Sequence, residues 1–120
     1  MARVLVAAQT TPGAYPALPI SANSRDLSMQ AGDSSLGNYT PIVEGKTLVI
    51  FQNTDSGAHT VGFTSAADTY NRTGDITGYS LGAGELCLFG PFKALGWSDG
   101  GNLDFNVSDN TVKVAVITLP

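Results

Sequence analysis

The chain has 120 residues and a formal net charge of −4, and only 13% of its residues are charged, about half the share typical of soluble domains. Its six Lys and Arg residues are scattered along the chain, which argues against a nucleic acid as partner, because phosphate binding needs clustered basic side chains. No apolar run approaches the roughly 20 residues that span a bilayer, so the sequence also argues against a membrane protein.

The first third of the chain is expected to be extended rather than helical. Arg3 to Ala8 is apolar after a basic start, but the run is too short for a signal peptide and predicts a strand. Four of the six prolines follow within the first 41 residues, and proline disfavours helix at its own position and the one before. The sequence therefore predicts an extended arm over 10–38, with one short strand at 25–29, and an N-terminal region that spans 1–44.

From Gly45 onward, short β-branched and aromatic runs alternate with turn residues, a pattern typical of an all-β protein. Strands are expected at 47–51 and 59–63, and the turn residues between them predict that the two strands pair. The polar stretch 65–78 is expected to be a surface loop.

Two more strand–turn–strand units are predicted in the second half of the chain. Strands 79–81 and 85–89 flank a Gly-Ala-Gly turn, and alternation puts Leu86 and Leu88 on one face with Cys87 on the other. Strands 103–107 and 112–119 are expected to form a hairpin. Because the last strand is apolar on both faces, it is expected to be central and covered on both sides.

Together these elements predict an all-β fold: a single β-sandwich body over 45–120, Greek-key or jelly-roll-like, with an extended N-terminal arm. One domain is expected, because 120 residues suffice to bury a core without disulfides or metal.

Residues capable of catalysis or metal binding are sparse. His59 and Cys87 are the only imidazole and thiol, whereas a blue-copper site needs two histidines and a cysteine, and structural zinc needs four N or S ligands. His59 with Asp55 and Ser56 could form a triad, but turn capping is the simpler interpretation. Cys87 is expected to be a buried apolar residue. We therefore expect no cofactor, no metal and no enzymatic activity.

Two binding alternatives remain open in the sequence. Paired carboxylates for glycoside hydrolysis could come from Glu85, Asp99 and Asp104, although nothing in their spacing selects them. Trp97, with Tyr70 and Tyr79, could stack on sugar rings, which would make the chain a carbohydrate-binding β-sandwich module. Scattered aromatic residues more often cap the ends of a β core.

The run from Tyr79 to Phe92, followed by Gly96-Trp97 and the ending Val112 to Pro120, resembles small β-rich virion structural proteins of tailed bacteriophages. The resemblance covers roughly 45–120 and concerns the order of strands and turns rather than a reactive motif. It implies a capsid decoration or cement protein. Such a protein is made in the host cytoplasm and resides on the capsid surface of the virion. In the same setting, the alternative is a carbohydrate-binding β-sandwich module on a virion fibre or tail.

The partners that this resemblance implies are the major capsid protein and further copies of the chain, with a homo-oligomer such as a trimer possible. Low charge agrees with that role, although Ser, Thr, Asn and Gly could equally make the surface soluble. We expect the N-terminal strand to add to a sheet of the shell or of a sister copy through main-chain hydrogen bonds. The residues assigned to this contact are Arg3, Val4, Leu5, Val6, Ala7 and Ala8, and the body is expected to fold without residues 1–9.

Overall fold

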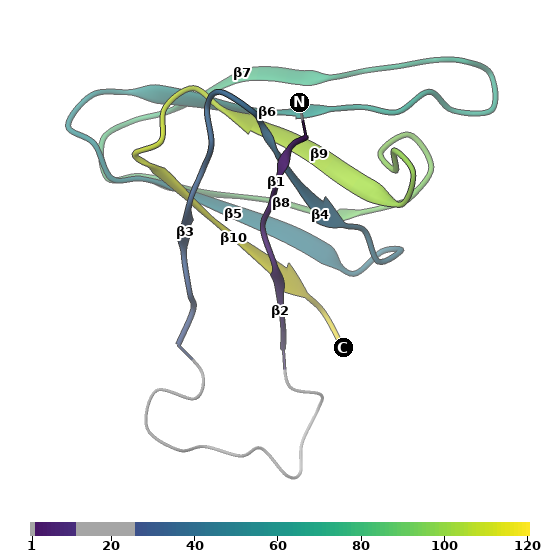
Figure 1. Ribbon diagram of the computed structural model, residues 1–120, viewed down its shortest axis with the longest axis horizontal. Coiled ribbons are helices and arrows are strands. Elements are labelled where there is room, and N and C mark those ends of the chain that lie inside the picture. The colour runs from purple at the N-terminus through teal and green to yellow at the C-terminus, as the bar shows by residue number, and fades with distance from the viewer. Residues whose placement is uncertain (1, 12–25) are drawn as a thin grey trace, which may run out of the picture.

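The computed structural model describes residues 2–11 and 26–120, and the described chain forms two packed β-sheets without a helix (Figure 1). In sheet A the strand order is β1 (Val4–Leu5), β4 (Asn38–Pro41), β9 (Asn102–Val107), β6 (His59–Thr64) and β7 (Ile76–Leu81). In sheet B the order is β2 (Ala8–Thr10), β10 (Val112–Thr118), β5 (Thr47–Asn53) and β8 (Leu86–Phe92), and β3 (Gln30–Ala31) also pairs with β10. The predicted all-β sandwich is confirmed.

Strict alternation of side chains builds the core between the sheets. β5 and β9 place every second residue inside, because successive side chains of a strand point to opposite faces. Phe51 lies at the centre, in edge-to-face contact with Phe63, Phe89 and Phe105 at centroid distances of 5.8, 6.1 and 5.8 Å. The largest fully buried apolar side chains are Phe51, Phe63, Phe105, Leu81, Leu103, Val6, Val49, Val112, Val114 and Val116.

Strands that follow one another closely in sequence lie in different sheets. β5 pairs with β8 and β10, whereas β6 pairs with β7 and β9. The predicted pairing of 47–51 with 59–63 is therefore wrong, and so is the predicted hairpin of 103–107 with 112–119. The turns after β5, β7 and β9 carry the chain across the sandwich, because each strand has one apolar face to bury against the opposite sheet.

The N-terminal residues are part of both sheets. β1 runs parallel to β4, and β2 runs parallel to β10, so one extended segment passes from sheet A to sheet B (Figure 1). Residues 4–5 and 8–10 of the N-terminal region thus pair with strands of the sandwich. The short strand expected at 25–29 is wrong for the described residues 26–29, which form no strand; a two-residue strand, β3, follows at Gln30–Ala31. Residues 12–25 of the predicted extended stretch lie outside the described residues.

The last strand is central, as predicted, because β10 lies between β5 on one side and β2 and β3 on the other. The polar stretch expected to extend to residue 78 ends earlier, because β7 begins at Ile76. Within 2–11 and 26–120, no helix has the length and apolar character needed to cross a bilayer.

Candidate functional site

The N-terminal residues that the sequence assigns to partner binding make extensive contacts inside the chain. The Arg3 guanidinium donates to Asn106 Oδ1 at 2.8 Å and to the carbonyl of Phe105 at 3.2 Å, and its Nε lies 3.6 Å from a carboxylate oxygen of Asp104. Val6 is buried in the core between the two short strands. Arg3 and Val6 therefore anchor the segment to the sandwich, while the side chains of Leu5, Ala7 and Ala8 remain at the surface.

The outer side of this segment is bridged by two glutamines. The side-chain amide of Gln9 both donates to the carbonyl of Ser28, at 2.7 Å, and accepts from its N–H, at 3.1 Å. Gln30 donates to the carbonyl of Leu5 at 3.0 Å. Gln30 thereby occupies the Leu5 carbonyl, a main-chain group that a partner strand would use, while Gln9 ties the end of the segment to Ser28. Binding of a partner through Arg3 to Ala8 stays a prediction, and it would have to compete with these contacts.

Trp97 is half-buried and packs on the aromatic core. Its ring lies edge-on to Phe92 at 5.4 Å and to Phe63 at 6.3 Å. It also borders a shallow groove of about 470 Å³ together with Phe89, Leu95 and other residues. The Trp97 ring therefore packs against the aromatic core while one side of it borders the groove.

The single histidine lies in a cluster with two carboxylates from neighbouring turns. His59 Nε2 is 2.8 Å from Asp55 Oδ2, and one ligand atom each from Asp55, His59 and Asp109 lie within 4.8 Å of one another. Hydrogen bonds to His59 and to the Ser56 amide lower the pKa of Asp55, and hydrogen bonds to Thr111 lower that of Asp109. One nitrogen and two oxygens could coordinate a divalent cation. The same arrangement also joins the turn after β5 to the turn after β9.

The triad considered from the sequence does not assemble. Ser56 donates its backbone N–H to Asp55 Oδ1 at 2.8 Å, which is the turn-capping arrangement. Cys87 is half-buried beside the core, and burial raises the pKa of its thiol, opposite to the shift that activates a nucleophile. Neither group is placed for nucleophilic catalysis.

Two of the three carboxylates considered for glycoside hydrolysis, Asp99 and Asp104, lie close to each other. Burial is the main cause that raises the pKa of Asp104; the nearby Arg3 charge lowers it, and Asp99 raises it further. Glu85 belongs to the turn before β8, where its Oε1 accepts from the Gly82 N–H at 2.6 Å. Asp104 is ion-paired with Arg3, so the charge of this carboxylate is already balanced by a basic side chain of the same chain.

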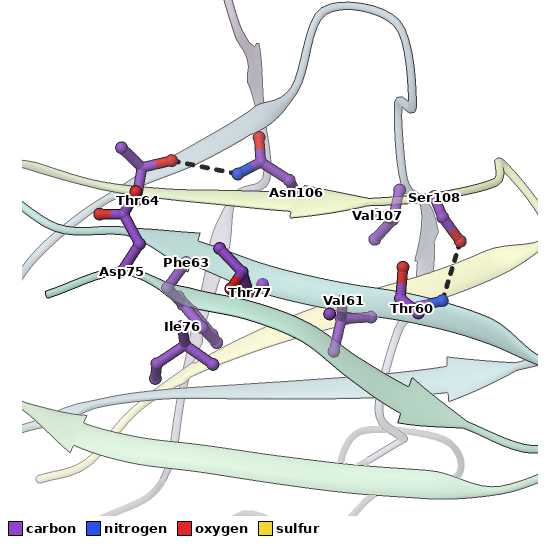
Figure 2. A pocket seen from close by; sticks show the side chains of 12 residues that line it. Thr60, Val61, Phe63, Thr64, Asp75, Ile76, Thr77, Asn106, Val107 and Ser108 are labelled. Carbon is purple, nitrogen blue, oxygen red and sulfur yellow. Dashed lines mark hydrogen bonds between the residues drawn. The ribbon is translucent and has the colours of Figure 1, made fainter.

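A second shallow groove, of about 260 Å³, follows the outer face of sheet A (Figure 2). Its rim carries hydroxyl and amide groups that already pair with each other: Asn106 donates to Thr64 Oγ1 at 3.1 Å, and the Thr60 N–H donates to Ser108 Oγ at 2.8 Å. Asp75, the titratable group of this groove, accepts from both the N–H and the hydroxyl of Ser65. The polar groups named here therefore already have hydrogen-bond partners within the chain.

The most distinctive surface is the side of the sandwich formed by the two edge strands β7 and β8, here called the β7–β8 side. Neither strand contains Lys, Arg, Asp or Glu. Tyr79 of β7 and Phe89 of β8 meet edge-to-face at 5.4 Å, which brings the two edges together. Leu86 and Leu88 are 60% and 59% exposed. Uncharged edges with exposed apolar residues are typical of contact surfaces.

Sequence reasoning placed Leu86 and Leu88 on a common face but did not identify that face as the outer one. The usable signal was the run of seven residues without charge, since natural edge strands usually carry charged residues that block pairing. Which strands are edges is decided by the tertiary fold, so the signal could not be interpreted from the sequence alone.

Comparison of the chain with protein-family models, with curated proteins and with solved structures found no match.

Proposed function

We propose that this protein is a non-enzymatic virion structural protein, a capsid decoration protein that binds capsid subunits and neighbouring copies of itself. The observation that carries the proposal is the β7–β8 side, where two uncharged edge strands meet and expose Tyr79, Leu86 and Leu88. Exposed apolar edges of this kind suit contact between proteins. The resemblance of the strand and turn order to small virion proteins supplies the specific setting.

The rest of the described molecule agrees with a contact role. The core is an interlocked aromatic cluster around Phe51 and Phe63, which gives a stiff platform for surface contacts. The single imidazole is hydrogen-bonded to Asp55, and the grooves among the described residues are shallow or internally paired. A module that stabilises a shell needs rigidity and adhesive surfaces, and it needs no reacting group.

The test is to purify particles of the virus whose genome encodes the chain and to measure the copy ratio of the chain to the major capsid protein. A fixed ratio, with density for the chain on the outer shell in particle images, is expected. Absence of the chain from purified particles would overturn the proposal. Binding to a glycan array that disappears in Trp97→Ala would instead favour the carbohydrate-binding alternative.

A further inference from the structure

The edge strand β8 lacks the usual protection against pairing over its regular part. Edge strands commonly carry charges, especially Lys, or are very short or bulged. β8 is seven residues long, and its ladder with β5 is regular from Leu86 to Phe89, before the irregularity at Gly90–Pro91. Leu86 and Leu88 project from the outer face of this regular part and are more than half exposed.

The pairing of β8 with β5 determines which main-chain groups are free. The Asn53 N–H donates to the carbonyl of Glu85 at 3.0 Å, and the ladder continues with Cys87 opposite Phe51. In an antiparallel ladder, hydrogen-bonded and non-bonded residue pairs alternate. Cys87 therefore directs its main-chain groups toward β5. The N–H and C=O groups of Leu86 and Leu88 point away from β5, out of the edge of sheet B.

We propose that two copies of this chain join through antiparallel pairing of their β8 strands around a twofold axis at Cys87. In this register, Leu86 of each copy lies opposite Leu88 of the other. The outward main-chain groups then meet in two residue pairs, each of which exchanges two hydrogen bonds. Shifting the axis to Leu86 or Leu88 leaves a single such pair within the regular part of the strand. The inference deepens the proposed function, because it names the surface through which neighbouring copies join.

The strand is complementary to itself in both charge and shape. Glu85 falls opposite Phe89 of the second copy, so no like charges face each other across the pair. The outer face of sheet B would continue across the axis, with the row of Ile50 and Leu88 next to Leu86 of the second copy. An isologous contact of this kind closes on itself and gives a dimer rather than a fibre.

The contact is small. One strand edge with four leucines buries less than the ~1,200 Å² of stable complexes, so the free protein is expected to dimerise with a Kd on the order of 0.1–1 mM. On a shell, where neighbouring copies are held close together, the same contact would be much more populated because the effective concentration is high.

The single cysteine provides a test of the register. Cys87 of one copy would lie opposite Cys87 of the other in a non-hydrogen-bonded pair, with Cα atoms about 4.5 Å apart, within the range of a disulfide. Diamide oxidises the two thiols to one disulfide: it accepts two electrons and two protons and becomes a hydrazine. A covalent dimer linked through Cys87 should therefore form when the protein is treated with diamide.

The experiment compares wild type, Leu88→Lys and the control Leu27→Lys, whose leucine is 43% exposed and precedes β3 at the opposite edge of sheet B. Sedimentation from about 10 µM to 2 mM should show a dimer in wild type and in Leu27→Lys. Leu88→Lys should weaken dimerisation at least about tenfold, because the edge then carries a charge. Diamide cross-linking should slow by a similar factor.

Monomeric wild type at 2 mM together with cross-linking that does not depend on Leu88→Lys would overturn the inference. Thermal unfolding shows whether Leu88→Lys is folded, and Leu86→Lys repeats the test if it is not. A protein that decorates particles but stays monomeric and resists cross-linking at Cys87 would refute the β8 pair alone. A protein that dimerises through β8 but is absent from particles would refute the proposed function alone.

Discussion

The side-chain amide of Asn53 donates to the carbonyl of Leu81 at 2.9 Å and so links the end of β5 in sheet B to the end of β7 in sheet A. The same nitrogen donates to the carbonyl of Gly57 at 2.8 Å, and Oδ1 accepts from the Asp55 N–H at 3.0 Å. Asn53 is fully buried. One residue thus joins the turns after β5 and β7, where the chain crosses between the sheets.

Replacing Asn53 with Ala is expected to lower the free energy of unfolding by about 2–4 kcal/mol, because buried carbonyls lose their donors. Asn53→Asp keeps the acceptor for Asp55 but places an oxygen against the two carbonyls, so it should destabilise at least as much. Urea unfolding followed by tryptophan fluorescence measures both. Wild-type stability in Asn53→Asp would show that the donated hydrogen bonds are not required.

Arg3→Ala is expected to cost about 1–2 kcal/mol of stability, because Asn106 and the Phe105 carbonyl lose a charged donor and Asp104 loses its counter-ion. Arg72→Ala is the matched control. Its guanidinium also pairs with an aspartate but is 74% exposed, so less than about 0.5 kcal/mol is expected. Equal effects of the two changes in urea unfolding would contradict a stabilising role for Arg3.

Deleting residues 1–9 should destabilise the whole sandwich rather than leave an intact body. The deletion removes Val6 from the core and removes β1 and most of β2 from their sheets. Loss of a buried valine alone costs on the order of 1–3 kcal/mol. A truncated chain with an unchanged Tm would show that the body folds independently of its N-terminus.

Gly62→Ala should destabilise by about 2 kcal/mol or more, because an added Cβ would lie within van der Waals overlap of the Ile76 carbonyl on the neighbouring strand. Gly74→Ala is a suitable control, because nothing lies near the Cβ position there and the backbone has no positive φ. Its stability should stay within about 0.5 kcal/mol of wild type. Thermal unfolding of the two variants distinguishes close strand packing from a general cost of replacing glycine.

Stability should fall in acid. The pKa values of Asp55 and Asp109 are lowered by hydrogen bonds from His59, Ser56 and Thr111, so the folded state binds their protons less readily than the unfolded state. Their contribution is present above about pH 4–5 and is lost as pH falls through the lowered pKa values. In a urea-unfolding series from pH 7 to 3, Asp55→Asn should reduce the loss of unfolding free energy toward low pH. An unchanged pH dependence would show that Asp55 does not contribute to it.

Asp104 contributes a pH dependence of stability with the opposite sign, because burial raises its pKa in the folded state. The folded state then holds this proton more tightly than the unfolded state, so the contribution of Asp104 decreases as pH rises through the raised pKa. In the same pH series, Asp104→Asn should therefore gain stability relative to wild type as pH rises through that range. A shift in the other direction would show that the Arg3 charge outweighs burial.

The sequence by itself determined the local structure. Alternating apolar residues identified the strands at 47–51, 59–63, 103–107 and 112–119, because period-two alternation is a property of a single strand with one buried face. The scarcity of His and Cys limited the chemistry of the site before any fold was known. Alternation also placed Leu86 and Leu88 together, since it requires no knowledge of neighbours.

Only the tertiary structure decided which strands pair and which edges remain open. A turn with Asn, Asp and Gly can close a hairpin or carry the chain to the opposite sheet, and the burial of Asn53 between two turns selects the second path here. The N-terminal segment looked free in the sequence because its anchors, such as Phe105 and Asn106, lie about a hundred residues away. Long-range packing leaves no local pattern, so the exposed edge of β8 became visible only once the sheets were assembled.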